Sequence, residues 1–183
     1  MKAGDDDVDD LGPDERFMSE ALEEALRARA IDEVPIGAVV VLDGVVIGRG
    51  HNRTRTGKDP TAHAEMAALR EAAAHVGAQR IVGATLYCTV EPCFMCAGAA
   101  SHARVARIVF GVRDPKFGAC GSLGDVPAHP GLNHRSDVVE GVRAEACRDL
   151  IVAFFREKRD LARRARSEGS VATDPNVDPR DPS

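Results

Sequence analysis

The hydrophobic residues of this chain recur with two different periods. Between Asp14 and about Ala30 they return at helical spacing, which gives an apolar face of Phe17, Ala21, Leu22, Ala25 and Leu26 and a polar face of Glu20, Glu23, Glu24 and Arg27. Two β-branched runs follow at residues 36–42 and 45–48, and the Asp43-Gly44 dipeptide between them favours a two-residue hairpin turn. The pattern predicts a helix and then a β-hairpin.

The remainder of the chain predicts helices that alternate with strands. A helix capped by Thr61 is expected to run to about Ala74, and another, with Pro92 in its first turn, to end near His102. Buried strands are expected at residues 84–90 and 107–112, and a last strand at 138–142. Residues 113–134 hold too many glycines and prolines for a long regular element, and a long loop inside a compact domain is usually functional.

A final helix is predicted from Ala144 to about Arg166. Its expected buried stripe consists of Ala146, Leu150, Ala153, Phe154 and Leu161. The order of elements indicates an α/β protein in which helices cover both faces of the sheet.

Composition narrows the class of protein. A chain of 183 residues, 44% of them hydrophobic, is expected to form one domain over residues 14–166, between a disordered acidic tail at 1–13 and a disordered tail at 167–183. No apolar run approaches the ~20 residues of a membrane span, so we expect a cytoplasmic protein with no membrane partner. Five cysteines, two of them in a C-x-x-C arrangement, fit metal binding in a reducing compartment better than a disulfide framework.

The charge is unevenly distributed along the chain. The net charge is −5, of which residues 1–15 carry −6 and residues 167–183 carry −3, so residues 16–166 carry +4. The predicted domain is therefore mildly basic, and a polyanionic substrate remains possible. The run of Arg156, Lys158, Arg159, Arg163, Arg164 and Arg166 is either a solvated helix face or a phosphate-contacting one.

Two short segments carry the chemistry. Thr61-Ala62-His63-Ala64-Glu65 and Glu91-Pro92-Cys93-Phe94-Met95-Cys96 contain the pattern H-x-E followed by P-C-x-x-C, a known signature of zinc-dependent nucleobase deaminases. Cys93 and Cys96 lie three residues apart and can hold one metal ion from a single helical turn. With His63 they supply three ligands for one Zn²⁺ per subunit and leave the fourth position open to water.

Glu65 is the candidate catalytic residue. A carboxylate is a poor match for a Cys/Cys/His ligand set, so we assign Glu65 proton transfer between a zinc-activated water and the substrate. Two plainer interpretations are a redox dithiol, which leaves His63 and Glu65 without a role, and a closed structural zinc site with Cys88 as fourth ligand. Asn52, in the loop after the hairpin, either contacts a ligand or satisfies its own turn.

The chain resembles the bacterial tRNA-specific adenosine deaminases over about residues 16–160. Beyond the zinc motif, the likeness lies in Glu33-Val34-Pro35-Ile36-Gly37-Ala38, His51-Asn52-Arg53, Arg113-Asp114-Pro115-Lys116, Asn133-His134-Arg135 and Phe154-Phe155-Arg156. The resemblance implies a cytidine-deaminase-like three-layer α/β/α sandwich with a mixed sheet of about five strands, and a homodimer. It implies zinc on His63, Cys93 and Cys96, with Glu65 as proton shuttle.

The resemblance also implies a substrate and its contacts. The expected reaction is hydrolytic deamination of adenosine to inosine at the wobble position of a tRNA(Arg) anticodon. Asn52 would contact the flipped nucleoside, and Asp114, Lys116 and Phe155 would approach the anticodon stem-loop. Phe117 stands where a small residue is usual in the family, and either packs on a base or covers the loop.

Two other functions remain open from the sequence. One is a free-base or nucleotide deaminase of the cytosine or guanine type, which would use the same zinc chemistry. The other is a non-catalytic zinc module that only binds RNA, in which Glu65 would have no role. The basic C-terminal helix, with Phe155 on it, favours an RNA substrate over a small molecule.

Overall fold

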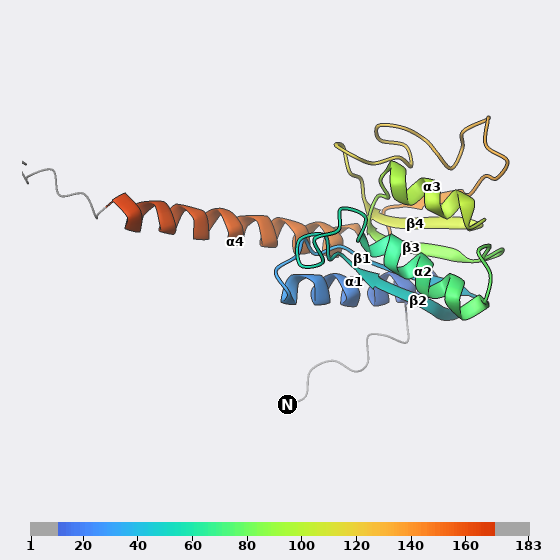
Figure 1. The fold of residues 1–183 in the computed structure, drawn as a ribbon, viewed down its shortest axis with the longest axis horizontal. Helices are drawn as coiled ribbons and strands as arrows, with labels where there is room; N and C mark the ends of the chain where they lie inside the picture. The colour runs from blue at the N-terminus through green and yellow to red at the C-terminus, as the bar shows by residue number, and fades with distance from the viewer. Residues whose placement is uncertain (1–10, 171–183) are drawn as a thin grey trace, which may run out of the picture.

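A computed structural model describes residues 11–170 of the chain (Figure 1). The predicted tails lie outside these residues, except for residues 11–13 and 167–170. The elements, in chain order, are α1 (Pro13–Ala30), β1 (Gly37–Leu42), β2 (Val45–His51), α2 (Ala64–Val76), β3 (Thr85–Val90), α3 (Phe94–His102), β4 (Arg107–Val112), β5 (Asp137–Glu140) and α4 (Ala144–Ser170). The predicted order of helices and strands is confirmed. None of the helices in the described region is long and apolar enough to cross a membrane.

The five strands form one mixed sheet in the order β2-β1-β3-β4-β5. β1 pairs antiparallel with both β2 and β3, whereas β4 lies parallel to β3 and to β5. The β1–β2 turn consists of Asp43 and Gly44, with φ of 51° and 75°, which are the two positive φ values that its hairpin turn requires. The predicted hairpin is therefore confirmed.

Each face of the sheet has its own core. Ala38, Val40, Leu86 and Phe110 pack on one side with the alanines of α2 and α3. Their strand neighbours Val39, Val41, Tyr87 and Val109 pack on the other side with α1 and with Cys147 of α4. Alternate residues of a strand point to opposite faces, so the sheet is covered on both sides and the three-layer α/β/α arrangement follows (Figure 1).

α2 lies very close to the backbone of β2. A Cβ atom at Gly48 would be 2.2 Å from the carbonyl oxygen of Ala68, and one at Gly50 would be 2.1 Å from that of Ala64. No side chain larger than a hydrogen fits between strand and helix there. These two glycines fix the distance between the sheet and the helix that carries Glu65.

Two residues of α1 lie on the opposite side of the helix from the prediction. Leu26 was expected in the core but is 52% exposed, whereas Glu24 was expected in solvent but is buried. One Glu24 carboxylate oxygen lies 3.0 Å from Nδ1 of His51 and the other 3.0 Å from Arg27. The contacts with His51 and Arg27 offset part of the cost of burying Glu24, whose Oε1 makes no hydrogen bond within the described residues.

The starts of α2 and α3 also differ from the prediction. His63, not Thr61, is the N-cap residue of α2, because the Thr61 side chain and backbone N–H both donate to Asp59 instead. Cys93 is the N-cap residue of α3, so Pro92 precedes the helix and is not part of its first turn. Both shifts place a candidate metal ligand at the N-terminus of its helix.

α4 is longer and less buried than predicted. It continues to Ser170, and its second half leaves the body of the domain (Figure 1). Phe154 is buried and Ala146 and Leu150 are partly buried, as predicted, but Ala153 is exposed and Leu161 is 52% exposed. The expected apolar stripe is wrong at Ala153 and at Leu161. Leu161 belongs to the second half of the helix, where no sheet surface is left to cover it.

Candidate metal centre and active site

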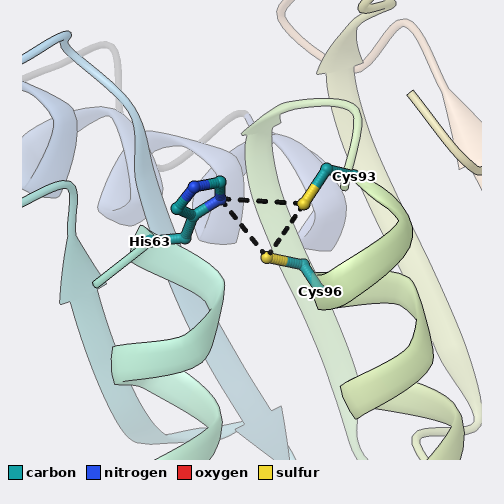
Figure 2. Close-up of side chains that lie close together, drawn as sticks. All are labelled: His63, Cys93 and Cys96. Atoms are coloured by element: carbon teal, nitrogen blue, oxygen red, sulfur yellow. Dashed lines mark hydrogen bonds between the residues drawn. The ribbon is translucent and has the colours of Figure 1, made fainter. Parts of the chain in front are cut away.

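His63, Cys93 and Cys96 meet where α2 and α3 begin (Figure 2). Cys93 Sγ lies 3.7 Å from His63 Nδ1, Cys96 Sγ lies 3.6 Å from the same nitrogen, and the two sulfurs are 3.6 Å apart. A tetrahedral zinc ion with Zn–S bonds of about 2.3 Å and a Zn–N bond of about 2.0–2.1 Å places its ligand atoms roughly 3.5–3.8 Å apart. The three side chains therefore fit one zinc ion, with His63 binding through Nδ1.

These three residues form the only group of its kind in the described part of the chain, residues 11–170. Cys88, the candidate fourth ligand, does not belong to the group; it is fully buried, and burial raises the pKa of its thiol well above the ordinary value. A fourth protein ligand is absent among the described residues. The geometry favours the open site over the closed structural one.

The surroundings of Cys93 favour its thiolate form. The hydrogen bond with Cys96 is the main cause that lowers the pKa of Cys93 to about 4, and the contact with His63 adds to it. The hydrogen bond with Cys93 and, after it, burial raise the pKa of the Cys96 thiol. Cys93 is the N-cap residue of α3 and Cys96 lies in its first turn, where free backbone N–H groups favour negative charge.

Glu65 lies in the first turn of α2, two residues after His63, and only 4% of it is exposed. Burial raises the pKa of its carboxyl to about 7. A carboxyl group that changes protonation state near neutral pH, held beside a metal centre, is suited to both accepting and donating a proton.

A pocket of about 300 Å³ opens onto the site. His63, Glu65 and Cys93 line it, together with Asn52 and Asp114. Asn52 is buried in its wall. The structure thus brings two of the four predicted substrate contacts to the same pocket as the candidate metal ligands.

The other two predicted substrate contacts lie outside this pocket. Lys116 and Phe155 line an adjoining hollow of about 610 Å³, which also includes Asp114 and Phe117. Phe117 lines both cavities, so its side chain stands on the rim between them.

Sequence reasoning did not single out Glu33, which supports one wall of the pocket. Glu33 is fully buried, and its Oε1 accepts hydrogen bonds from the backbone N–H of Thr56 at 2.6 Å and from its hydroxyl at 3.0 Å. Its Oε2 lies 3.5 Å from the side-chain nitrogen of Asn52. The carboxylate holds the loop that carries Asn52.

Sequence reasoning also missed the role of Glu91, which lines the pocket. Its carboxylate accepts hydrogen bonds from the backbone N–H groups of Asp114, Cys120 and Ser122, at 2.9–3.0 Å, and from the Ser122 hydroxyl. Burial opposes ionisation, but these donors outweigh it and lower the pKa of Glu91. An ionised, buried carboxylate thus holds the loop after β4 against the end of β3. A glutamate directly before P-C-x-x-C was the only available sequence signal.

Comparison with known proteins agrees with this site. The sequence profile of the cytidine and deoxycytidylate deaminase zinc-binding region matches residues 12–112. The tRNA-specific adenosine deaminase of Bacillus subtilis is 47% identical over 153 residues, which cover 84% of this chain and 95% of the relative. That of Agrobacterium fabrum is 50% identical over 143 residues, covering 78% of this chain and 94% of the relative.

A similar solved structure comes from work on A-to-I editing by tRNA:A34 deaminases at the wobble position of transfer RNA. It is 48% identical, has a TM-score of 0.71, and covers 73% of this chain and 97% of that chain. The predicted cytidine-deaminase-like fold is confirmed by this likeness.

Proposed function

Because this chain belongs to the tRNA-specific adenosine deaminases, within the zinc-binding cytidine and deoxycytidylate deaminase family, we propose that it converts adenosine to inosine at the wobble position of a tRNA anticodon. One observation carries the proposal: a buried carboxylate, Glu65, lies beside a three-ligand metal centre at the base of a pocket. A metal site that only held RNA would have no use for that carboxylate.

We assign the roles in the site as follows. His63, Cys93 and Cys96 hold the zinc ion, which when bound supplies the Lewis acidity that activates a water molecule. Glu65 moves the protons: it accepts one from the attacking water and delivers it to the ring nitrogen next to the amino-bearing carbon. It then takes the second proton from the added hydroxyl group and passes it to the amino group, which leaves as ammonia. Such a shuttle contributes ~10²–10⁴-fold in rate.

The residues around the site favour RNA over a free base. Asn52 offers an amide for hydrogen bonding to the nucleoside in the pocket. Outside the pocket, Lys116 and Phe155 line a second hollow, a combination of positive charge and aromatic surface that a small substrate does not need. A base in an RNA loop is already unpaired, so its extrusion into the pocket costs less than extrusion from a duplex.

Several finer points belong to the same proposal. The substrate is the tRNA(Arg) anticodon stem-loop, with Asp114 and Lys116 near its backbone. The enzyme is a cytoplasmic homodimer with one zinc ion per subunit. Residues 14–166 form the deaminase domain. The support for these points is the resemblance of the sequence to the tRNA-specific adenosine deaminases.

The test is inosine formation on a tRNA(Arg) anticodon stem-loop by zinc-loaded protein, with free cytosine and guanine assayed in parallel. Glu65→Gln is expected to retain zinc and lose at least ~10²-fold in kcat. Glu23→Gln changes an exposed glutamate of α1 that does not line the pocket, so it serves as the matched control and should behave like the wild type. Deamination of a free base but not of RNA would refute the proposed substrate. Zinc-dependent RNA binding without any deamination would refute the proposed enzymatic activity.

A further inference from the structure

An exposed aromatic side chain stands at the mouth of the catalytic pocket. Phe117 is 65% exposed although it lies within a few residues of a buried core strand, β4. Val152 and Phe155 are also exposed and line the same hollow, so the three side chains form an apolar patch of the kind that marks a ligand-binding groove. The place of Phe117 between the two cavities makes that ligand continuous with whatever fills the pocket.

The backbone beneath Phe117 is held firmly. Oδ1 of Asp114 accepts hydrogen bonds from the N–H of Lys116 at 2.9 Å and of Phe117 at 3.2 Å. The N–H of Asp114 itself donates to Glu91. The next residue, Gly118, forms an antiparallel bridge with Cys93. The ring is therefore presented from a fixed loop, and an ordered platform loses little entropy when it binds.

The hollow beyond Phe117 has the chemistry of a single-stranded nucleic acid site. Its floor is apolar, with Val34, Ile36 and Val90 shared with the pocket. Lys116 and Arg148 line it and carry positive charge, and Phe155 of α4, 43% exposed, lines it too. Aromatic faces bind bases by stacking, and cations bind the phosphates between them.

We propose that Phe117 is a stacking platform for the nucleobase next to the target adenosine, and that this base occupies the hollow between Phe117 and Phe155. The inference rests on the proposed function. If the target base enters the pocket, the RNA strand must leave it across the rim, and Phe117 is the aromatic surface on that rim. Lys116 and Arg148 then face the flanking phosphates.

Three substitutions separate stacking from mere coverage of the pocket. Stacking on an aromatic ring is lost in Phe117→Ala and Phe117→Leu, so KM for the stem-loop should rise by about 5- to 150-fold in both, with little change in kcat. Phe117→Trp should stay near the wild type. Leu123→Ala removes an apolar side chain of the same loop, 59% exposed and outside both cavities, and should change nothing. A leucine that works as well as phenylalanine would overturn the proposal.

The second arm changes the RNA. Two stem-loops are compared, one lacking the base on the 5′ side of the wobble adenosine and one lacking the base on the 3′ side. One of them should give a lower kcat/KM with the wild-type enzyme, and on that RNA Phe117→Ala should cause no further loss. If Phe117→Ala lowers kcat/KM by the same factor on the complete and on the abasic RNA, the proposed stacking contact is overturned.

A direct binding readout separates this inference from the proposed function. 2-aminopurine placed at the sensitive position should lose fluorescence on binding to Glu65→Gln, and keep it on binding to a variant that also carries Phe117→Ala. That readout tests stacking without turnover. Absence of inosine with a normal fluorescence change would refute the function alone.

Discussion

Gly118 is the position where a single methyl group should disturb the active site most directly. A Cβ atom there would lie 2.4 Å from both Cδ and Oε2 of Glu91 and 2.6 Å from the carbonyl oxygen of Asp114. Non-bonded heavy atoms prefer about 3.5–4.0 Å, so the loop would have to move by more than ~1 Å. Because Glu91 is tied to three backbone N–H groups, it cannot simply rotate away.

The expected cost follows from these contacts. Overpacking costs about 1–3 kcal/mol, and each charge-assisted hydrogen bond to Glu91 that stretches beyond its range adds up to about 1.5–3 kcal/mol. We expect Gly118→Ala to lower kcat/KM on the stem-loop by ~10- to 100-fold, mainly through KM. The reason is that Asp114 and Phe117, which line the pocket, are carried by the same loop.

The assay pairs steady-state kinetics with hydrogen exchange. The amide of Asp114 should exchange faster in Gly118→Ala, while bound zinc stays at the wild-type level. Gly98→Ala is the matched control: its Cβ would meet nothing within 4 Å, and alanine inside a helix should stabilise it by about 0.5–1 kcal/mol. Wild-type KM and unchanged exchange at Asp114 in Gly118→Ala would refute the idea that Glu91 and Gly118 position this loop.

Two further predictions concern stability and the metal. Arg107 donates to both carboxylate oxygens of Asp14, at 2.7 and 2.6 Å, and chiefly through these bonds lowers the pKa of Asp14. That stabilisation is present above the unfolded-state pKa of about 3.9 and is lost as acid protonates the folded carboxyl. Asp14→Asn should therefore lower the free energy of unfolding by about 1–2 kcal/mol at pH 7, and urea titrations should show this deficit shrinking between pH 5 and 3. A deficit that does not change with pH would contradict this. Cys88→Ala should keep one zinc per chain by elemental analysis, because Cys88 lies outside the ligand group; loss of the metal would instead show that Cys88 ligates it.

The metal ligands were predictable because their geometry is mostly local. Cys93 and Cys96 lie within one helical turn, and a spacing of three residues is enough to bring their sulfurs together. The hairpin was predictable for a similar reason, since Asp43 and Gly44 alone determine its turn. Pairing His63 with the cysteines required the known motif, because that contact depends on how α2 and α3 pack on the sheet.

The supporting carboxylates could not be read from the sequence. Glu33 binds backbone 23 residues away and Glu91 binds backbone 23 to 31 residues away. A glutamate in a sequence pattern reads as exposed unless its distant partners are known, and the same error put Glu24 on the wrong side of α1. Burial of an acidic residue is decided by tertiary donors that periodicity does not report.

In the exposed part of α4, the sequence pattern predicted burial where the structure shows exposure. Helical periodicity correctly placed Phe154 in the core but also placed Leu161 there, because amphipathic spacing continues beyond the end of the sheet. Periodicity says which side of a helix is apolar. It does not say how far the surface that covers that side extends.

The contact of Gly48 and Gly50 with α2 makes one part of the protein far less tolerant of substitution than the rim of the pocket. Along that strip, helix and strand meet backbone to backbone, so almost every other amino acid is excluded and the height of Glu65 above the sheet is not adjustable by mutation. The rim of the pocket carries no such restriction. A programme of directed evolution on this scaffold should therefore find new substrate preferences in the loop around Phe117, and almost none in β2.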